Sequence, residues 1–555
     1  MTIHQQPGAR LAETLIHDRT VPRIWNRDVG VWGAAPGSAD AKSIELRLGW
    51  LDLATTMVPD LDRVVKLGEA VKAEGIRTVY LLGMGGSSLV AEVLRSVFGV
   101  AEGYPRLSVL DTTDERTIVA AAAGLEASHT LFLVSSKSGG TVEVASMERF
   151  FWHRMAAGLS SDTGRQFVAI TDPDTALHRL AESKGYRDVF VNPPDIGGRF
   201  SALSLFGLVP AALIGAPVRA IVAAGAAMAE GCRQENHQNA GLELGAFIGA
   251  AVRDGRDKLT LALSPRLASL GLWIEQLIAE STGKRGTGAL PVVDEPLGAP
   301  EEYGDDRAFV AVGTEVDAPD TARLHALESA GYPVLRLATR IDGLGAEFFR
   351  WEFATAIAGA ALTVNPFDEP NVAEAKEKTR ALLASFAADG KLPETTPAAE
   401  DAATAVYSRR FSGSSPAAVV RSAVDSLRPG DYAAFLSYLP VESGVESVIA
   451  DVRQGIRSRK RAASTFGVGP RYLHSTGQYH KGGPKTAVAF VITADDETST
   501  EIPGADYSFA VLKRAQALGD VAALEAHDQR TVRIHVKAAS AAGHTIERLF
   551  AETLG

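Results

Sequence analysis

The chain has 555 residues, of which 46% are apolar and 22% are charged, a composition typical of a soluble globular protein with several domains. Its formal net charge of −11 at pH 7 argues against a nucleic-acid binder, because there is no basic surplus to neutralise phosphates. The one cysteine, Cys232, excludes an internal disulfide framework and suits a reducing cytoplasm.

Two segments bear on whether the chain enters a membrane. The N-terminal segment lacks the apolar core of a secretion signal. Residues 200–218 carry no charge and are just long enough to span a bilayer. However, prolines and glycines interrupt this stretch, and no second one resembles it. It therefore predicts a buried helix that begins near Ser201 and breaks around Pro210 or Pro217. We expect a cytoplasmic protein without a membrane partner.

The pattern of apolar residues predicts an α/β fold. Residues 1–70 have a mostly helical pattern. Residues 71–217 then alternate strands with helices, and residues 218–385 do so again, a rhythm typical of doubly wound parallel sheets with helices on both faces. The strands expected in these two units lie near residues 77–83, 106–111, 130–135, 167–171, 188–192, 258–264, 307–313 and 332–338.

The remaining chain predicts a connection and a third unit. Residues 386–416 are rich in alanine, proline and threonine, which favours a linker between domains. Residues 417–555 predict a smaller C-terminal α/β unit. Its expected strands lie near residues 431–439, 486–493 and 531–538.

Two turns in the first unit have the composition of a phosphate site. One follows the strand near 77–83 and the other follows the strand near 130–135. Glycines let backbone N–H groups approach a ligand, and a helix N-terminus presents unpaired donors. Neither turn matches a nucleotide-binding pattern, so the predicted ligand is a small phosphorylated molecule. The alternative is that small residues only cap two strand-to-helix turns. The turns contain Gly85, Gly86, Ser87, Ser88, Ser136, Lys137, Ser138, Gly139, Gly140 and Thr141.

A helix expected at 271–281 carries a candidate base near its C-terminal end. Gln276 and Glu280 are four residues apart and share one face of this helix, which Gly283 then stops. The negative end of the helix dipole should raise the pKa of Glu280, which suits a general base near neutral pH. The alternative is a solvated glutamate at a helix end.

Two cationic residues are candidates for contact with an anion. Arg199 lies beside two glycines in IGGRFSALS, where its guanidinium can clamp an oxyanion or a phosphate, or can cap nearby carbonyls. Lys376 lies in the first turns of the helix that follows NPFDEP, an unfavourable end of the helix dipole for a cation unless it faces an anion.

A glycine-rich loop at 473–484, LHSTGQYHKGGP, contains His474, His480 and Lys481. An imidazole that exchanges protons near pH 7 is favoured over a metal ligand, because no cysteine or well-spaced carboxylate completes a ligand set. The sequence therefore predicts no metal site.

Five motifs in order resemble the glucose-6-phosphate isomerase family of sugar-isomerase-domain proteins. They are G-x-G-G-S, S-K-[ST]-x-x-T, G-G-R-[FY]-S, Q-x-x-x-E-S-x-G-K and N-P-F-D-x-P-x-V-x-x-x-K. The stretch L-H-S-T-G-Q-x-H-K-G-G-P is similar to one in the isomerase half of bacterial transaldolase–isomerase fusion proteins. The likeness covers roughly residues 20–540. We expect no transaldolase half, because little chain precedes the first phosphate turn.

This resemblance implies two sugar isomerase domains and a cofactor-free aldose–ketose isomerase. It would interconvert glucose 6-phosphate and fructose 6-phosphate through an enediol or enediolate, as a cytoplasmic homodimer in glycolysis and gluconeogenesis. Two alternatives remain open: an isomerase of another phosphosugar, such as mannose 6-phosphate or a sulfonated analogue, and a non-catalytic regulator that binds sugar phosphates.

The resemblance also implies roles for individual residues. Glu280 would move the proton between C1 and C2, and Arg199 would stabilise the enediolate. Lys376 would lie near the ring oxygen, and Gln276 would help position the substrate. The other positions implied or expected to contact the substrate are Gly86, Ser87, Ser136, Lys137, Ser138, Thr141, Gly198 and Lys481.

The chain departs from the family pattern at two places. Glu369 replaces the usual glutamine of N-P-F-D-Q-P and adds a negative charge near the expected site. The family histidine that opens the sugar ring usually precedes N-P-F-D, where this chain has no good match. We therefore expect His474 to supply that group from the third unit. His480 is the competing candidate, with a pKa depressed by neighbouring Lys481, and the other alternative is a purely structural loop.

Overall fold

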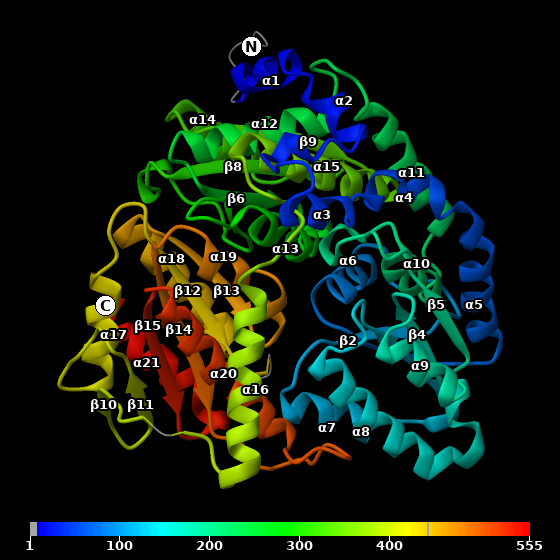
Figure 1. Cartoon of the computed structure of the whole chain (residues 1–555). Coiled ribbons are helices and arrows are strands. Elements are labelled where there is room, and N and C mark those ends of the chain that lie inside the picture. Colours follow the sequence, from blue (N-terminus) through cyan, green and yellow to red (C-terminus); the bar gives the residue numbers. More distant parts are fainter. Residues whose placement is uncertain (1–7, 315, 394, 441–442, 555) are drawn as a thin grey trace.

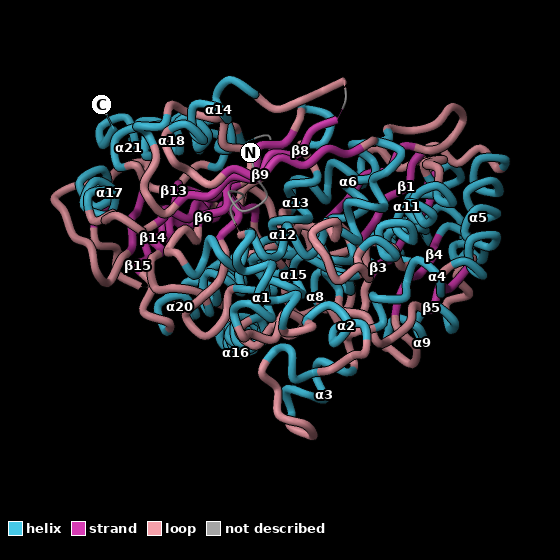
Figure 2. The backbone as a smooth tube through the Cα atoms, turned by 90° about the horizontal axis from the view of Figure 1, so that it is seen from above, coloured by secondary structure: helices cyan, strands magenta, loops and turns pink. Residues whose placement is uncertain are grey.

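The computed structural model describes residues 8–314, 316–393, 395–440 and 443–554. Residues 1–7 of the predicted helical segment and residue 555 of the predicted C-terminal unit lie outside this range. Within the described residues, the strands form three sheets that helices flank, so the fold is α/β as predicted (Figure 1). In the view of Figure 2, the strands of the second sheet lie between those of the first and the third.

The first sheet is parallel and has the strand order β2-β1-β3-β4-β5. Its strands are β1 (Thr78–Leu82), β2 (Arg106–Leu110), β3 (Thr130–Ser135), β4 (Phe167–Thr171) and β5 (Asp188–Val191). The helices around it are α5 (Leu61–Ala73), α6 (Leu89–Phe98), α7 (Glu115–Ala123), α8 (Val142–Leu159), α9 (Ala176–Ser183) and α10 (Leu205–Leu213).

The burial of β3 explains why helices cover both faces of this sheet. Leu131 and Leu133 belong to the apolar core that contains α5, α6 and α10, whereas Phe132 and Val134 belong to the core that contains α7, α8 and α9. Successive side chains of a strand point to opposite faces, so a strand of continuous apolar residues requires a helix layer on each side.

The second sheet is also parallel, with the order β7-β6-β8-β9. Its strands are β6 (Lys258–Leu263), β7 (Leu290–Val292), β8 (Arg307–Thr314) and β9 (Val334–Thr339). The sequence did not predict β7, which is only three residues long and contains a proline. The helices of this unit are α11 (Val218–Gly231), α12 (Ala240–Arg253), α13 (Leu270–Thr282), α14 (Thr321–Ser329) and α15 (Leu344–Leu362).

The N-terminal helices belong to the same core as the second unit. Trp32 and Trp50 are buried in the apolar cluster that also contains residues of α12 and α15. Trp32 Nε1 donates to the carbonyl of Ala356 at 2.9 Å. These helices are α1 (Ala9–His17), α2 (Thr20–Trp25), α3 (Ala39–Glu45) and α4 (Leu53–Thr56).

The third sheet is mixed and has the order β10-β11-β15-β14-β12-β13. The strands β12 (Tyr432–Ser437), β13 (Ala463–Val468), β14 (Ala487–Ala494) and β15 (Arg530–Val536) are parallel, and β10 (Ala399–Glu400) and β11 (Thr404–Tyr407) add an antiparallel edge. The helices are α16 (Val372–Asp389), α17 (Pro416–Asp425), α18 (Val445–Lys460), α19 (Gly477–Gly482), α20 (Phe509–Ala526) and α21 (Ala542–Leu554).

The third unit corrects three sequence predictions. The segment 386–416 is not only a connection, because it contains β10 and β11 of this sheet. The strand β13 was not predicted, since its sequence ASTFGV mixes polar residues and glycine with few large apolar ones. The sequence predicted that the C-terminal unit is the smaller one. In the described part of the chain, however, its sheet has more strands than either of the other two sheets.

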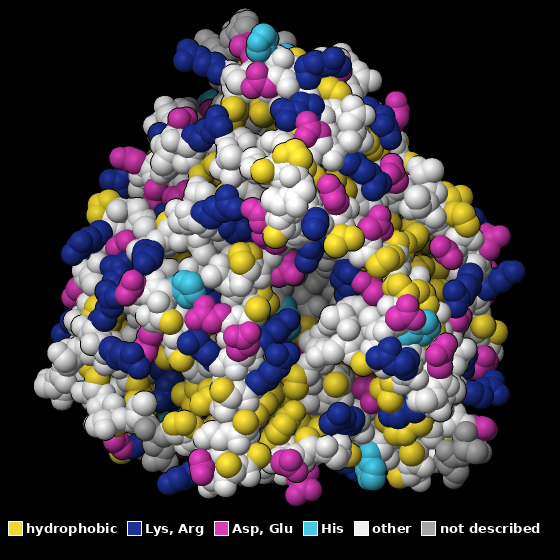
Figure 3. Space-filling view, in the orientation of Figure 1, with side chains coloured by type: hydrophobic (Ala, Val, Ile, Leu, Met, Phe, Trp, Pro, Cys, Tyr) yellow, Lys and Arg dark blue, Asp and Glu magenta, His cyan; other side chains and the backbone are white. Residues whose placement is uncertain are grey.

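The uncharged segment 200–218 is part of the buried core. It forms α10, which begins at Leu205 rather than near Ser201, continues through Pro210 and ends at Leu213. Of the two expected breaks, the one at Pro210 is therefore wrong; the helix instead ends between Leu213 and Pro217, and the next helix begins at Val218. No helix in the described ranges is long and apolar enough to span a bilayer. Basic and acidic side chains are intermingled over the face shown in Figure 3.

Candidate active site

A cleft of about 450 Å³ brings together motifs that lie far apart in the sequence. The two glycine- and hydroxyl-rich turns, the short Gly198–Phe200 helix, α13, the start of α16 and the Arg471–His474 turn contribute to its walls. Eleven of the thirteen predicted site residues line it. They are Gly86, Ser87, Lys137, Ser138, Thr141, Gly198, Arg199, Gln276, Glu280, Lys376 and His474.

The glycines of the first turn allow two motifs to touch. A Cβ atom at Gly86 would lie 2.0 Å from the carbonyl oxygen of Gly198, which leaves no room for any other residue. Gly85 has a positive φ of 54°, a conformation that favours glycine. The backbone of this turn therefore packs directly against the segment that carries Arg199.

The second turn precedes the first turn of α8. Ser136 Oγ and Thr141 Oγ1 are 3.1 Å apart, so Ser136 lies behind Thr141 rather than on the cleft wall. Lys137 forms an ion pair with Asp172 and donates to the carbonyl of Pro194 at 3.3 Å. Lys137, Ser138 and Thr141 are the residues of this turn that line the cleft.

Arg199 joins several motifs through one buried guanidinium, which is 2% exposed. Its Nε donates to Ser281 Oγ at 2.7 Å, and Nη2 donates to the carbonyls of Pro366 and Asp368 at 2.7 and 2.8 Å. Arg199 thus caps carbonyls, which was the alternative role predicted for it, through Nη2 alone. The Nη1 atom faces two carboxylates in the cleft, of Glu280 at 3.3 Å and of Glu369 at 3.1 Å.

Glu280 is buried rather than solvated at a helix end, so that alternative is wrong. Gln276 Nε2 donates to Glu280 Oε2 at 3.0 Å, as their shared helix face predicts. Burial raises the pKa of Glu280 above its ordinary value, and the nearby charge of Glu369 adds to this effect, whereas Arg199 opposes it. The structure thus attributes the raised pKa to burial, whereas the sequence suggested the helix dipole.

Glu369 places its negative charge at the site, as expected from its departure from the family pattern. One carboxylate oxygen contacts Arg199, and the other lies 3.7 Å from Arg47 Nη2. Both arginines line the cleft.

Lys284 was not singled out from the sequence. Its Nζ donates to the carbonyls of Asn365 and Asp368 at 2.5 and 2.6 Å and to Asp368 Oδ1 at 2.7 Å. Burial, with the repulsion of Arg199, lowers the pKa of Lys284 to about 8, although Asp368 opposes the shift. Lys284 therefore fixes the loop of residues 365–370 that supplies carbonyls to Arg199.

His474 forms a pair with a second residue that sequence reasoning missed. Its Nε2 lies 2.8 Å from Oε1 of Glu143, a buried side chain in the first turn of α8. Gln516 Nε2 also donates to this oxygen at 2.7 Å. Burial acts to raise the pKa of Glu143, but His474, a backbone amide and Lys376 together hold it below its ordinary value. The only sequence signal was a glutamate two residues after Thr141.

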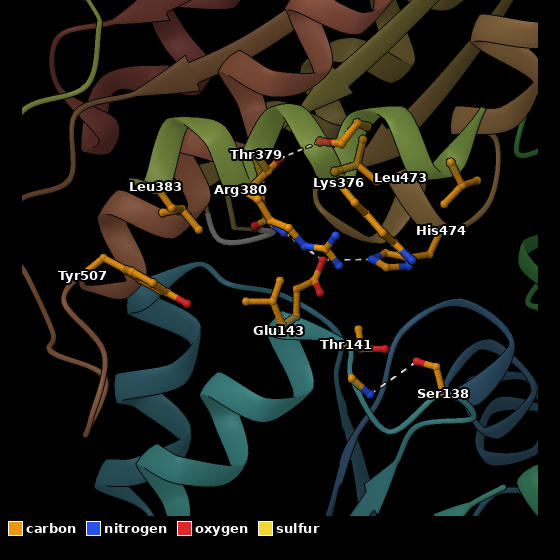
Figure 4. Close-up of a pocket in the computed structure, with 15 residues that line it drawn as sticks. Ser138, Thr141, Glu143, Lys376, Thr379, Arg380, Leu383, Leu473, His474 and Tyr507 are labelled. Carbon is orange, nitrogen blue, oxygen red and sulfur yellow. Dashed lines mark hydrogen bonds and ion pairs between the residues drawn. The ribbon is translucent and has the colours of Figure 1, made fainter. Parts of the chain in front are cut away.

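A second cavity of about 380 Å³ adjoins the cleft around this pair. Ser138, Thr141, Lys376 and His474 line both spaces. In Figure 4, His474 and Glu143 point toward each other, and Lys376 reaches down from α16 toward them. The third unit thus contributes the start of α16 and the Arg471–His474 turn to the cleft, whose remaining walls come from the chain before α16.

The other two residues of the glycine-rich loop point elsewhere. His480 is buried with Nδ1 2.7 Å from Tyr432 Oη, and burial, followed by the charge of Lys481, lowers its pKa to about 3. Lys481 Nζ pairs with Asp520 at 2.7 Å. Neither side chain lines the cleft, so the predicted substrate contact of Lys481 is wrong in this structure. The described residues contain no cluster of three potential metal ligands.

Sequence comparison decides the family. The family model described as phosphoglucose isomerase matches residues 57–305. A glucose-6-phosphate isomerase of Rubrobacter xylanophilus is 30% identical over 380 residues, which cover 58% of this chain and 86% of that protein. The chain belongs to the phosphoglucose isomerase family. A probable glucose-6-phosphate isomerase of Natronomonas pharaonis is 29% identical over 379 residues, covering 61% of this chain and 85% of that protein.

Solved structures share the phosphoglucose isomerase fold. A hypothetical protein from Thermus thermophilus superposes with a TM-score of 0.58 and 26% identity, covering 66% of this chain and 95% of that chain. A glucose-6-phosphate isomerase from Chlamydia trachomatis has a TM-score of 0.51 and 19% identity, covering 68% and 79%. The match to the phosphoglucose isomerase family model ends at residue 305, so Lys376 and His474 lie beyond it.

Replacing Lys284 by methionine should destabilise the protein. The change leaves the partly exposed Asp368 carboxylate and two carbonyls without their buried donor, which should lower the free energy of unfolding by about 1–3 kcal/mol. Lys378→Met is the control, because the ion pair of Lys378 with Glu374 at 3.6 Å is partly exposed on α16, and its loss should change stability by less than about 1 kcal/mol. Urea unfolding measures both, and a Lys284→Met variant as stable as the control would contradict the assigned role.

Proposed function

We propose that this protein interconverts glucose 6-phosphate and fructose 6-phosphate by proton transfer through an enediolate. The observation that carries the proposal is the pairing of Glu280 with Arg199. A buried carboxylate with a raised pKa lies 3.3 Å from a buried guanidinium on the wall of the cleft. Moving a proton between neighbouring carbons of a sugar requires such a base, and a cation beside the charge that develops on the oxygens.

The phosphate group would lie between the two turns of the first unit. These turns precede α6 and α8 and offer hydroxyls and backbone N–H groups at helix N-termini, which favour an anion. Ser87, Ser138 and Thr141 would contact the phosphate, with Ser136 supporting Thr141 from behind. The ammonium of Lys137 would add less, because Asp172 already pairs with it.

His474 would open the sugar ring. Ring opening requires one proton delivered to the ring oxygen and another removed from the anomeric hydroxyl, and an imidazole exchanges protons in the neutral range. The hydrogen bond to Glu143 would hold the imidazole ring in place. Lys376 lines the same space and would lie near the ring oxygen.

We further infer a cytoplasmic homodimer that acts in glycolysis and gluconeogenesis, as the family resemblance implies. Because Glu280, Arg199 and His474 line the cleft of one chain, a second copy would not have to supply the histidine. Light scattering of the purified protein measures the number of copies.

Replacing Glu280 by glutamine should remove the base while keeping the shape of the side chain. We expect kcat to fall at least about 10²-fold with little change in KM. The measurement is a coupled assay on a panel of hexose 6-phosphates, with unphosphorylated glucose as a very poor substrate. Glu377→Gln, an exposed change on α16, is the control and should retain full activity.

Three outcomes of this assay would contradict the proposal. Near-normal turnover by Glu280→Gln would remove Glu280 as the base. Faster turnover of mannose 6-phosphate would change the substrate. Tight binding of sugar phosphates without turnover would indicate a regulator instead of an enzyme.

Replacing His474 by alanine should impair ring opening but not proton transfer. Turnover of cyclic glucose 6-phosphate should fall at least about 10²-fold. Erythrose 4-phosphate cannot close a ring through its phosphorylated oxygen, so exchange of its C2 hydrogen with solvent, followed by NMR, should persist in His474→Ala and disappear in Glu280→Gln. His480→Asn retains a polar atom near Tyr432 and is the control. Loss of activity confined to His480→Asn would transfer the role, and two fully active variants would exclude the loop from the mechanism.

The acid limb of the pH profile should report Glu280. Because the base must be ionised, kcat/KM should fall with an apparent pKa above 4.5, the ordinary value for glutamate. Glu369→Gln removes a negative charge near Glu280 and lowers its pKa, so the limb should move to lower pH. Glu377→Gln should leave the profile unchanged. A shift to higher pH in Glu369→Gln would show that another group controls the limb.

A further inference from the structure

A separate cavity of about 540 Å³ lies where the three sheets approach one another. Its walls include residues of β2 and β13 and the residues that follow β7. These three strands lie at the edges of the first, third and second sheets. The start of α13, part of α6 and the Arg471–His474 turn complete it. None of its lining residues belongs to the cleft described above.

The charges around this cavity are unbalanced. Both arginines on its wall already have carboxylate partners: Arg95 pairs with Glu92, and Arg471 binds Asp111 through two hydrogen bonds of 2.7 and 2.8 Å. Glu275 and Asp294 form no ion pair with the described residues. The cavity therefore presents two carboxyl groups without an ion-pair partner among the described residues, and only the buried Arg453, which does not line the cavity, acts on both of them through its charge.

Glu275 is the residue that points to a ligand. Its side chain lines the cavity although the residue is only 7% exposed, and its Oε1 has no hydrogen-bond partner among the described residues. A buried carboxyl group without a partner is costly, so such a group in an open cavity indicates a missing donor. Burial, with the charge of Asp294, raises the pKa of Glu275 to about 8, although Arg453 and Arg471 oppose the shift.

The chemistry of the lining favours an organic cation over a metal ion. The described residues contain no group of three potential metal ligands. The remaining walls include apolar side chains such as Leu107, Leu272 and Phe466, which suit the carbon skeleton of an organic molecule. An ammonium group would supply the donors and the positive charge that Glu275 and Asp294 lack.

The cavity and the catalytic cleft share a wall. On α13, Glu275 lines the cavity, whereas the next residue, Gln276, lines the cleft. On the other side, Ser475 lines the cavity and His474 lines the cleft. Gln276 Nε2 donates to the carbonyl of His474 at 2.7 Å and joins the two segments. A molecule in the cavity would thus contact the segments that hold Glu280 and His474.

We propose that this cavity binds a small organic ammonium ion, whose charge pairs with Glu275 and Asp294. Occupation of the site changes the affinity of the cleft for sugar phosphate, because both spaces share α13 and the Arg471–His474 turn. This second effect rests on the proposed function, whereas binding of the amine does not.

Calorimetry on the whole protein tests the site. The probes are ethanolamine, 1,4-diaminobutane and spermidine, with 1,4-butanediol as the uncharged match for the diamine. Glu275→Gln keeps the size of the side chain and should weaken amine binding at least about tenfold. Glu92→Gln is the control, since Glu92 is already paired with Arg95 and should alter binding less. Thermal unfolding verifies that each variant is folded.

Each outcome of this experiment decides the proposal. Binding of an amine but not of the diol, lost in Glu275→Gln, supports it. Equal binding by Glu275→Gln, or no binding by any probe up to a Kd of about 10 mM, overturns it. A second titration with glucose 6-phosphate should give a Kd that the bound amine changes at least about fivefold. If the protein bound no sugar phosphate, the proposed function would fail, but the amine titration would still test whether the cavity binds an amine. If the Kd for glucose 6-phosphate were the same with and without bound amine, the proposed coupling between the cavity and the cleft would be wrong.

Discussion

The candidate active-site cleft depends on the need to satisfy one buried cation. Arg199 is 2% exposed, so water cannot solvate its guanidinium and the protein must supply the acceptors. They are one hydroxyl, two carbonyls and two carboxylates, which come from α13 and from the loop of residues 365–370. If either segment moved away, a buried charge would lose its partners. This requirement holds the segments in one arrangement, and Lys284 reinforces it from the side of the loop.

The same network sets the proton affinity of the proposed base. Burial pushes both Glu280 and Lys284 toward their neutral forms, since a low-dielectric environment disfavours either charge. Arg199 limits this effect at Glu280, and Glu369 strengthens it. The carboxylate at position 369 therefore acts on the proton affinity of Glu280 through its charge. A carboxylate that is both buried and partly compensated has a pKa between the extremes, which suits a group that must accept and return a proton.

The third unit completes a cleft that the first two units leave open. It supplies His474, whose side chain contacts Glu143 of the first unit and whose backbone carbonyl accepts a hydrogen bond from Gln276 of the second. These contacts make the Arg471–His474 turn a junction of all three units. The turn also separates the cleft from the cavity around Glu275. The segments that line the cavity are therefore the same ones that hold Gln276 and His474 at the cleft.

The sequence by itself determined the α/β class, most strands, the two glycine- and hydroxyl-rich turns and the candidacy of Glu280 and Arg199, because these depend on local periodicity, on glycine and on motif spacing. It missed short or polar strands such as β7 and β13, whose neighbours rather than their own residues stabilise them. Only the tertiary structure decided which histidine of the glycine-rich loop faces the cleft and which is buried against Tyr432. It alone paired His474 with Glu143, 331 residues away, since such a contact is made by packing and leaves no local pattern in the chain.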